Sequence, residues 1–512
     1  MEKNMILAVS ISVLILFLWP FLFGLNKKAP ETKVANKTTA STTTGGTATT
    51  KEAAKDEAIT IEKVGAQYII ENDLVAVTID TMGAAVKQVA FKKYKDPKGQ
   101  VVKFFGESAK NVGALKILDQ SKTMFSVVSQ TENRITLRSG ASTVEYTLPQ
   151  GLYSLNAKIN SAGKDKIELR LLSFLSDNSK DQYGLDSDPD KRKRDMLLYS
   201  ADKAERFTPK DIKEKQIISF ASSPKWIGVT DRYFLFSVIT PKNDGLFTDV
   251  VIRAGKENPV TLADFSLTGK NGVFEYTLFM GPKDVTDLRK VDPTLADSID
   301  YGWFTVISVP MLELMKFFYK VIPNYGVAIL LLTLLVRLIM FPLQHKSMKS
   351  MKKMQELQPH IKALQEKYKG DKAKVNSEMM QFMKTHKVNP MSGCLPMLLQ
   401  LPVFIALYNV LASSVELYHA PFIFWLHDLS IKDPYYVMPI LMGIMMFLQQ
   451  KMTPNPTMDP TQAKMMLYML PVIFTVFMVS LPSGLTLYIM FSTLLGILQQ
   501  HFMNKQTSVK TA

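Results

Sequence analysis

The sequence predicts an α-helical membrane protein with six transmembrane helices and a large exported β-sandwich domain. Apolar runs long enough to cross a bilayer lie near the N-terminus and in the C-terminal half. Between them, short alternating segments are separated by turn residues, which is typical of β-strands. Of the 512 residues, 47% are hydrophobic and 21% are charged, so apolar and charged stretches must be segregated along the chain.

Residues 1–28 are predicted to form an N-terminal signal-anchor transmembrane helix. The apolar run 5–25 has about the 20 residues that cross a bilayer, and lysines stand on both sides of it. A cleaved signal peptide is the alternative, but the run is long for one and no small-residue cleavage site follows before Lys27. Residues 29–56 are rich in Thr, Ala, Lys and Gly, and we expect a flexible tether there.

Residues 57–300 are predicted to form the exported, periplasmic β-sandwich. Segments such as 74–79, 143–148 and 273–279 alternate apolar and polar residues, and Gly, Asn, Asp and Pro punctuate them. The stretch contains no histidine and no cysteine, so the commonest acid/base groups and metal ligands are missing. This composition favours a binding or scaffolding role over catalysis.

Residues 301–323 are predicted to form an amphipathic helix that lies in the outer membrane interface. The segment is apolar and nearly long enough to span, but it contains Pro310, Glu313, Lys316 and Lys320. If it crossed the bilayer, the exported domain and the lysine-rich loop described next would lie on the same side, which contradicts either the N-terminal anchor or the positive-inside rule. An interfacial helix avoids this conflict.

Residues 324–502 are predicted to form a five-helix core, followed by a short cytoplasmic tail, 503–512. The expected spans are 327–343, 395–411, 437–448 extended at both ends, 466–480 and 485–498. Lysines crowd the loop after the first of these, whereas the turn 481–484 has no charge, so the lysine-rich loop is assigned to the cytoplasm. Both chain termini are then cytoplasmic. The net charge of +15 is accordingly attributed to the membrane surface.

The lysine-rich loop, 345–388, is predicted to be a cytoplasmic helical hairpin. Two runs with apolar residues at three- and four-residue steps are separated by Gly370 as a helix stop and Asp371 as an N-cap. Its lysines could form an ordinary solvated face or a docking surface for RNA or anionic lipid, and the sequence does not choose between them. The candidate docking residues are Lys352, Lys353, Lys362 and Lys367.

Arg337 lies inside an expected membrane span, where its charge costs about 2.5 to 3.5 kcal/mol on insertion scales. Thr333 precedes it by four residues and Gln344 follows by seven, so one helix face is polar. Snorkelling to the cytoplasmic interface is a marginal alternative because that interface is about 12 Å away along the helix. An acidic partner is the other alternative, but the remaining C-terminal spans have no Asp or Glu in their apolar centres. A hydrated cavity open to the cytoplasm is therefore favoured.

Signatures of soluble enzymes are missing from the sequence. There is no GxxxxGK[ST] phosphate loop, no HExxH motif and no GxSxG motif, and the single cysteine, Cys394, permits neither an internal disulfide nor a Cys-based zinc site. We expect no catalytic residue, metal or cofactor. An ion-coupled transporter or channel remains the rival, although no paired repeats are evident. The 29 methionines suit either ordinary packing or a surface that accepts varied apolar partners.

Three motifs, 389–408, 433–443 and 481–488, resemble the YidC family of membrane protein insertases in its Gram-negative form. Together with Arg337 and the basic hairpin, these motifs cover the C-terminal half of the sequence. The N-terminal anchor, the tether and the exported domain also resemble the Gram-negative form, so the resemblance extends more loosely over the full length. The resemblance implies an insertase and chaperone of the cell inner membrane, related to the Oxa and Alb insertases. Nascent membrane proteins would be its clients in the lipid bilayer, and it would act alone or with the Sec translocon and its accessory proteins. The ribosome is a further candidate partner, and DNA is not.

The resemblance also implies a hydrated groove with a central arginine. By matching motif positions, the polar groove residues would be Arg337, Thr333, Gln400 and Tyr488. The apolar substrate contacts would be Leu401, Phe404, Met442 and Phe477. Some family members have paired tyrosines where this chain has Tyr488 followed by Ile489, so the polar contact would be either absent or made by Tyr488. The exported domain would resemble the supersandwich of sugar mutarotases without their chemistry.

Overall fold

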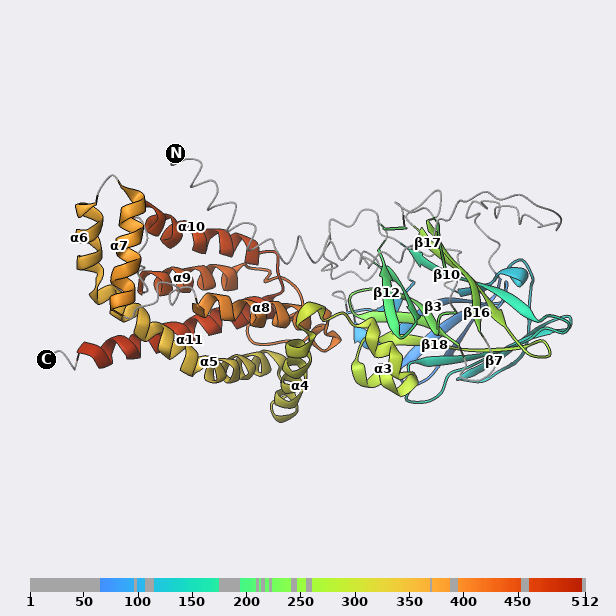
Figure 1. Cartoon of the computed structure of the whole chain (residues 1–512). Helices are drawn as coiled ribbons and strands as arrows, with labels where there is room; N and C mark the ends of the chain where they lie inside the picture. The colour runs from blue at the N-terminus through green and yellow to red at the C-terminus, as the bar shows by residue number, and fades with distance from the viewer. Residues whose placement is uncertain are drawn as a thin grey trace, which may run out of the picture. The chain divides into compact units, whose positions relative to one another are not determined.

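Two nine-stranded β-sheets and a set of helices make up the part of the chain that the computed structural model describes (Figure 1). The described residues are 65–95, 99–105, 115–174, 194–208, 211–212, 217–220, 223–240, 246–254, 260–368, 371–386, 395–452 and 460–508. The chain divides into Met1–Thr60 and Ile61–Ala512. The predicted anchor, 1–28, and tether, 29–56, lie outside the described residues.

All strand pairings in the two sheets are antiparallel. The first sheet has the order β1 (Gln67–Glu71), β2 (Val75–Asp80), β3 (Ala85–Lys95), β5 (Leu115–Ile117), β10 (Lys166–Phe174), β17 (Val260–Thr268), β16 (Phe247–Ala254) and β13 (Ile217–Phe220), with β4 (Val101–Phe104) beside β3. The second has the order β12 (Lys203–Phe207), β11 (Asp195–Ser200), β14 (Trp226–Thr230), β15 (Phe234–Ile239), β18 (Val273–Pro282), β9 (Ser154–Asn160), β8 (Ser142–Thr147), β7 (Arg134–Ser139) and β6 (Ser126–Gln130).

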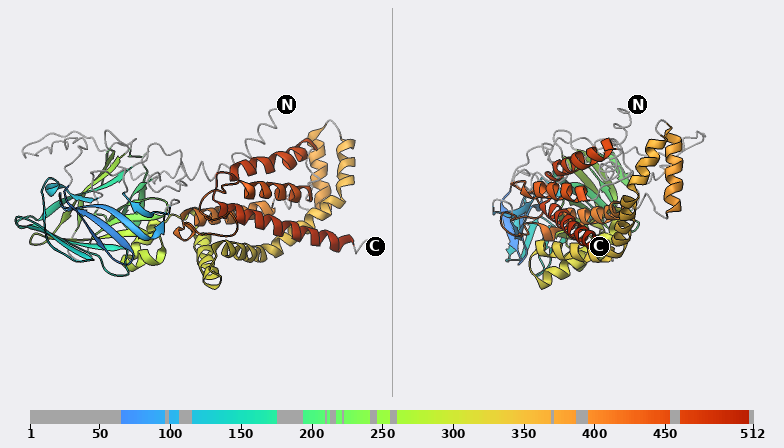
Figure 2. Two further views of the ribbon diagram at one scale, coloured as in Figure 1. Left: turned by 180° about the vertical axis from the view of Figure 1, so that it is seen from behind. Right: turned by 90° about the vertical axis from the view of Figure 1, so that its left-hand side faces the viewer.

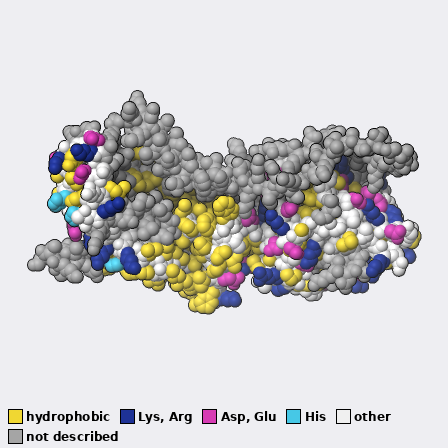
Figure 3. Space-filling model, in the orientation of Figure 1, with side chains coloured by type: hydrophobic (Ala, Val, Ile, Leu, Met, Phe, Trp, Pro, Cys, Tyr) yellow, Lys and Arg dark blue, Asp and Glu magenta, His cyan; other side chains and the backbone are white. Residues whose placement is uncertain are grey.

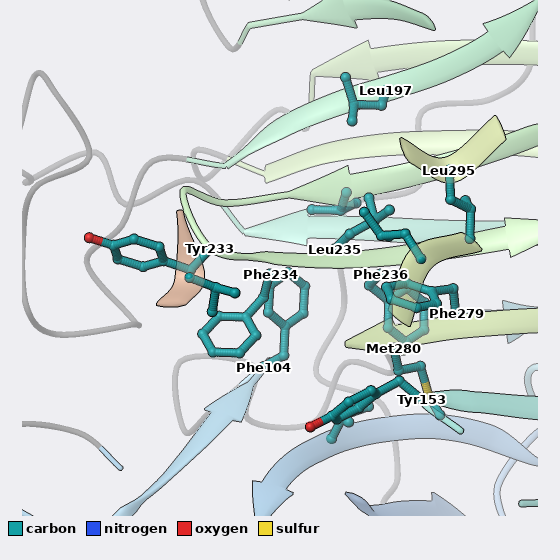
Figure 4. Close-up of a cluster of buried hydrophobic side chains, with 14 of the residues drawn as sticks. Phe104, Tyr153, Leu197, Tyr233, Phe234, Leu235, Phe236, Phe279, Met280 and Leu295 are labelled. Atoms are coloured by element: carbon teal, nitrogen blue, oxygen red, sulfur yellow. The ribbon is translucent and has the colours of Figure 1, made fainter. Parts of the chain in front are cut away.

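Side chains from both sheets meet in one apolar core (Figure 4). In β9, buried and exposed residues alternate along the second half of the strand, because successive side chains of a strand point to opposite faces. The Phe91 ring of β3 stacks on the Phe234 ring of β15 with centroids 4.4 Å apart, and the Phe104 ring of β4 lies 6.4 Å from that of Phe236. The predicted β-rich domain is therefore confirmed.

A short connection leads from the sheets to the helices. It comprises α3 (Val285–Val291), the 3-10 turns η4 (Pro293–Ser298) and η5 (Gly302–Phe304), and α4 (Thr305–Val321). On α4, Met311 and Met315 are buried, whereas Val306 and Phe317 are exposed, as expected of an amphipathic helix. The element overlaps the segment predicted to lie in the interface, and its position relative to a bilayer stays a prediction.

Five further helices form the body of the C-terminal region (Figure 2), and the predicted helical character of this region is confirmed. They are α5 (Tyr325–Glu356), α8 (Leu395–Ser413), α9 (Val437–Met452), α10 (Pro460–Met478) and α11 (Ser483–Ser508). Among the described residues, α5 alone is long and apolar enough to cross a membrane, and shorter apolar stretches are Gln400–Ser413, Val437–Met452 and Lys464–Met478. The count of six transmembrane helices stays a prediction.

The helical hairpin is shorter than the sequence analysis predicted. Helix α5 continues through Pro342 to Glu356, so Lys352 and Lys353 lie on its last turns and not on the hairpin. Pro359 lies in the first turn of the next helix, where its missing amide hydrogen is tolerated, and it cannot continue the hydrogen bonds of α5. The hairpin itself is α6 (Gln358–Lys367) and α7 (Lys372–Thr385), which lie side by side in Figure 1. Asp371 caps α7 as predicted, because its carboxylate accepts the Lys374 amide at 3.0 Å.

The helical region carries an apolar outer surface. Exposed large apolar side chains gather on it, as Figure 3 shows over part of one face, whereas charged side chains are spread over the β-rich domain. On α5 they include Leu338 and Ile339, which are 60% and 69% exposed, and on α10 Val472 and Val476. Exposing a contiguous apolar surface of this kind to water is unfavourable, and contact with the hydrocarbon of a bilayer would avoid that exposure.

An ionic cluster joins the β-rich domain, α4 and the segment after α8. The Lys316 ammonium lies 2.9 Å from Asp284 Oδ2 and 2.6 Å from Glu416 Oε1, and all three side chains are largely buried. Asp284 is the N-cap of α3, and Glu416 lies in the 3-10 turn η7 (Val415–Leu417). Nearby, Arg232 Nε donates to the Ala412 carbonyl at the end of α8. These contacts hold α4 and the α8 terminus against the domain.

Candidate functional site

The guanidinium of Arg337 is bound within the helix bundle. Its Nε donates to Ser492 Oγ at 3.0 Å, Nη1 donates to Gln344 Oε1 at 3.1 Å, and Nη2 donates to the Ser492 carbonyl. The side chain is half-buried and Gln344 is buried. The guanidinium is therefore held between Ser492 on α11 and Gln344, which lies about two turns further along α5.

A glycine on α11 makes room for this charge. A Cβ placed on Gly496 would lie 3.4 Å from Arg337 Nη2 and 2.6 Å from Gln449 Nε2 on α9. The contact with Gln449 is closer than real Cβ atoms make, whereas the distance to Arg337 is that of ordinary van der Waals contact. The missing side chain lets α5, α9 and α11 approach one another around the guanidinium.

The arginine belongs to a connected set of polar side chains. Gln400 Nε2 on α8 donates to the Tyr488 hydroxyl at 2.6 Å, and this hydroxyl also hydrogen-bonds the Ser492 side chain. Residues four apart lie on one helix face, which places Tyr488 and Ser492 together on α11. Gln400, Tyr488, Ser492, Arg337 and Gln344 therefore form a continuous polar chain inside an otherwise apolar bundle.

Three of the four predicted polar groove residues belong to this polar chain, namely Arg337, Gln400 and Tyr488. The fourth, Thr333, is fully buried, and its hydroxyl donates to the Ile329 carbonyl one turn earlier at 2.6 Å. A threonine in a helix readily bonds the i−4 carbonyl, which removes the need for another partner. The structure thus does not bring the Thr333 hydroxyl to the arginine. The functional role of all four residues stays a prediction.

The four predicted apolar contacts differ in exposure. Leu401 and Phe404 on α8 and Phe477 on α10 are half-buried, and Phe404 and Phe477 pack against the main apolar core. Met442 on α9 is fully buried in that core. The role of these four residues as contacts for a client stays a prediction.

The sequence analysis did not select Ser492 or Gly496 as site residues, and it named Gln344 only as part of a polar face. A signal was present on α11, where Tyr488, Ser492 and Gly496 follow one another at four-residue steps within an apolar span. A line of polar and small residues at this spacing marks a face that approaches another helix closely. Only the structure shows that Arg337 lies opposite this face.

The partners of the Arg337 guanidinium in the described part of the chain are neutral oxygens. Hydrogen bonds to such oxygens stabilise a guanidinium without cancelling its charge. The site can therefore attract an anionic group from another molecule. The described residues include no group of three or more His, Cys, Asp and Glu side chains that could hold a metal.

The candidate docking lysines have different environments. Lys353 and Lys367 are exposed, and the Lys367 ammonium lies 5.4 Å from the ring centroid of Tyr368. Lys352 is half-buried, and its Nζ donates to the Met503 carbonyl on α11 at 2.6 Å. The side chain of Lys362 lies outside the described residues. Of the three lysines whose side chains the structure describes, Lys353 and Lys367 present their charge to solvent.

Comparison with known proteins gives consistent matches. The family described as YidC periplasmic domain matches residues 67–314, and the family described as 60Kd inner membrane protein matches residues 317–510. A membrane protein insertase YidC from Geotalea daltonii is 35% identical over 99% of both chains. Another from Geobacter sulfurreducens is 44% identical over 57% of this chain and 55% of the relative. A crystal structure described as an active YidC insertase covers 87% of this chain and 94% of its own, with 19% identity and a TM-score of 0.41.

The β-rich domain followed by the helical region thus defines an inner-membrane protein with a periplasmic domain. The chain belongs to the YidC family of membrane protein insertases. Its function is membrane protein insertion, as predicted, and it is not an enzyme.

Proposed function

We propose that the protein inserts its clients through a hydrated groove that is open to the cytoplasm. In this groove the polar chain that includes Arg337 receives the hydrophilic flank of a client. The observation that carries this proposal is the guanidinium itself. It lies within the apolar stretch of α5 and donates to the neutral oxygens of Ser492 and Gln344, so its charge is available to a client.

The physical benefit of this site is a shorter path through hydrocarbon. The apolar core of a bilayer is about 30 Å thick, and unsatisfied polar groups in it cost several kcal/mol each. Polar side chains part of the way across the bilayer shorten the distance that a client flank travels through hydrocarbon. At that point the flank can exchange its hydrogen bonds with water for hydrogen bonds with Arg337. The apolar client span would meanwhile slide along Leu401, Phe404 and Phe477, with Met442 reached on repacking.

The proposed topology has six transmembrane helices and both termini in the cytoplasm. The exposed lysines on the last turns of α5 and on the hairpin support it, because lysines concentrate on the cytoplasmic side. A phosphatase that is active only outside the cytoplasm checks it. Fused after Ala512 the enzyme is expected to be inactive, and fused after Tyr435, between α8 and α9, it is expected to be active. The opposite pattern would contradict the proposed orientation.

We also propose that the protein acts alone on simple clients and with the Sec translocon on others.

We further propose that the ribosome docks on exposed lysines such as Lys353 and Lys367. Their positive charge suits RNA, whose phosphates attract lysines in a salt-dependent way. Replacing both by glutamate is expected to reduce cosedimentation with ribosomes. Unchanged cosedimentation would contradict this docking role.

The experiment that tests the proposed function uses Gly496, which lies beside Arg337 without contributing a side chain. Gly496→Leu fills the space of the guanidinium and is expected to lower the insertion rate of an acidic-flanked, single-span client about tenfold, or about 1.4 kcal/mol. Gly496→Ala is the matched control, because Gln449 can move and alanine favours the helix by about 1 kcal/mol.

The measurement is protease protection of the inserted client in liposomes that contain the purified protein and no translocon. Equal insertion by the two variants would contradict a role for this site. Liposomes that passed a small solute down its gradient but inserted no client would instead support the rival transporter or channel.

A further inference from the structure

Four aromatic residues lie on the loop between α8 and α9, and we call them the aromatic cap. They are Phe424, Trp425, Tyr435 and Tyr436. The Phe424 side chain is 79% exposed and that of Tyr435 is 68% exposed. The rings of Phe424 and Trp425 stack with their centroids 6.0 Å apart. Exposed apolar groups of this kind mark a contact with another molecule or with a membrane.

One buried aspartate holds the two halves of the aromatic cap together. Asp433 Oδ1 accepts hydrogen bonds from Trp425 Nε1 and from the Tyr435 amide, both at 3.0 Å. Asp433 Oδ2 accepts the Met438 amide, in the first turn of α9, at 2.7 Å. A single carboxylate thus binds both parts of the cap to the start of the helix. Because the cap is already ordered, its association with a partner costs little conformational entropy.

The backbone has a positive φ at two positions of the aromatic cap. Phe424 has a φ of 52° and Tyr436 a φ of 59°. This left-handed backbone costs of order 1–3 kcal/mol for a residue with a side chain, and it persists where the surrounding structure imposes it. In this loop the Leu426 amide donates to the Ile423 carbonyl at 3.1 Å, and the Tyr436 amide donates to the Asp433 carbonyl at 3.3 Å. The loop therefore holds the Phe424 ring outward, where packing within the chain stabilises it little.

The aromatic cap continues the apolar outer surface of α9. Ile440, Ile444 and Leu448 are exposed and follow one another at four-residue steps, so they share one face of the helix. Tyr436 directly precedes α9, and its carbonyl accepts the Ile440 amide at 3.3 Å. The 16 residues of α9 extend about 24 Å, and the exposed Lys451 lies at the far end. Because the hydrocarbon core of a bilayer is about 30 Å thick, the cap lies where an apolar face of this length reaches the edge of the hydrocarbon.

The chemistry of the cap and its border suits phospholipid headgroups. Tryptophan and tyrosine are enriched at the boundary between hydrocarbon and water, because their rings are apolar and their edges are polar. His427 and Lys432 are exposed beside the cap, and a lysine can place its stem along apolar surface while its ammonium reaches a phosphate. The loop lies on the side of the β-rich domain, because the Tyr418 ring is 5.1 Å from that of Tyr233 between their centroids.

We propose that the aromatic cap is a lipid-binding surface, which inserts into the headgroup region of the bilayer on the side of the β-rich domain. The Phe424 and Tyr435 rings enter the boundary between headgroups and acyl chains, and the Lys432 ammonium pairs with lipid phosphate. This contact fixes the depth at which α9 begins. The inference goes beyond the proposed function and does not depend on the groove, so the two can fail separately.

Quenching of Trp425 fluorescence by brominated phospholipids tests the proposal. In a Trp19→Phe, Trp303→Phe background the remaining tryptophans are Trp425 and Trp226, and Trp226 is fully buried in the β-rich domain. The full chain is placed in liposomes whose acyl chains carry bromine either close to the headgroup or near the chain end. We expect the shallow bromines to quench about twofold more strongly than the deep ones. An absence of quenching, or stronger quenching by the deep bromines, would overturn the proposal.

Matched substitutions separate lipid contact from folding of the loop. Phe424→Asn with Tyr435→Asn removes both inserted rings but keeps the bonds of Asp433, which use the Trp425 side chain and a main-chain amide. Asparagine also tolerates a positive φ better than phenylalanine does. We expect this variant to lower the quenching about threefold, whereas Phe424→Leu with Tyr435→Phe keeps the surface apolar and should resemble the unmodified protein. Equal quenching in the two variants would contradict insertion of the cap.

A spin label at residue 424 distinguishes lipid from other occupants. In a Cys394→Ser background, the label on Phe424→Cys is exposed in liposomes to oxygen, which dissolves in hydrocarbon, and to a nickel chelate, which stays in water. The control label is on Val128→Cys, at a residue of β6 that is 58% exposed in the β-rich domain. We expect the ratio of oxygen to nickel accessibility to be about fivefold higher at residue 424. Equal ratios would place the cap in water, and protection from both reagents that increases with the ratio of protein to lipid would identify a second copy of this chain. Either result would overturn the assignment to lipid.

Discussion

Arg337→Ala is expected to lower the insertion rate of a client with an acidic flank about tenfold, or about 1.4 kcal/mol. The alanine removes three donor contacts to Ser492 and Gln344 together with the positive charge. Arg337→Lys retains the charge but replaces the planar five-donor group by a compact ammonium, so we expect most of the activity to remain. The measurement is protease protection of the client in liposomes.

Two comparisons give this prediction its meaning. A client with an uncharged flank should be affected much less by Arg337→Ala, because the charge then has no anionic partner. Lys346→Ala is the matched control on the same helix, since Lys346 is an exposed cation outside the polar chain. If the alanine and lysine variants inserted the acidic-flanked client equally well, charge attraction would be excluded, and the arginine would act at most by keeping the groove hydrated.

Sequence patterns predicted the helices well because the physical signals were local. An intramembrane charge, an aspartate N-cap and a lysine-rich loop are visible within a few residues, and they pointed to Arg337, Asp371 and the hairpin. The bounds of the hairpin were less local. The sequence analysis placed the hairpin at 345–388, whereas α5 continues through Pro342 to Glu356 and the hairpin helices are Gln358–Lys367 and Lys372–Thr385.

The contacts between helices could not be predicted in the same way. Ser492 and Arg337 are 155 residues apart, and their hydrogen bond depends on how α5 and α11 pack. Thr333 was expected beside the arginine because both lie on one helix face, but the hydroxyl is satisfied by its own helix. Spacing predicts which side chains share a face, whereas competition for a hydrogen-bond partner decides which of them meet.

Lys316→Met is expected to destabilise the junction of the β-rich domain, α4 and the η7 turn by about 3 kcal/mol. The Lys316 ammonium lies 2.9 Å from Asp284 and 2.6 Å from Glu416, and the two carboxylates are only 19% and 11% exposed. Removing the lysine leaves both acids buried without their cation. The loss is measured as a lower thermal unfolding midpoint of the purified protein. Lys320→Met, at an exposed lysine one turn further along α4, is the control and should have little effect.

The pH dependence follows from the pKa of each group. Burial raises the pKa of Glu416, and the charge of Lys316 opposes this rise. Burial also acts to raise the pKa of Asp284, but the hydrogen bond and charge of Lys316, together with hydrogen bonds from the Asp287 amide and Glu416, lower the pKa. Burial acts to lower the pKa of Lys316, whereas the charge of Glu416 and its hydrogen bonds raise it. Because its folded pKa is raised, Lys316 contributes its full stabilisation below its unfolded pKa and loses it as the pH rises through the folded value.

Without Lys316, the pKa of Glu416 should rise further. A carboxyl group with a raised folded pKa binds more protons in the folded state, so its contribution to stability falls as the pH increases above its unfolded value of about 4.3. The destabilisation by Lys316→Met should therefore be larger at pH 8 than at pH 5. Adding Glu416→Gln should recover much of it, because one buried charge is removed. A loss that is the same at both pH values, or that Glu416→Gln does not reduce, would show that packing of the lysine stem, and not its charge, holds α4 in place.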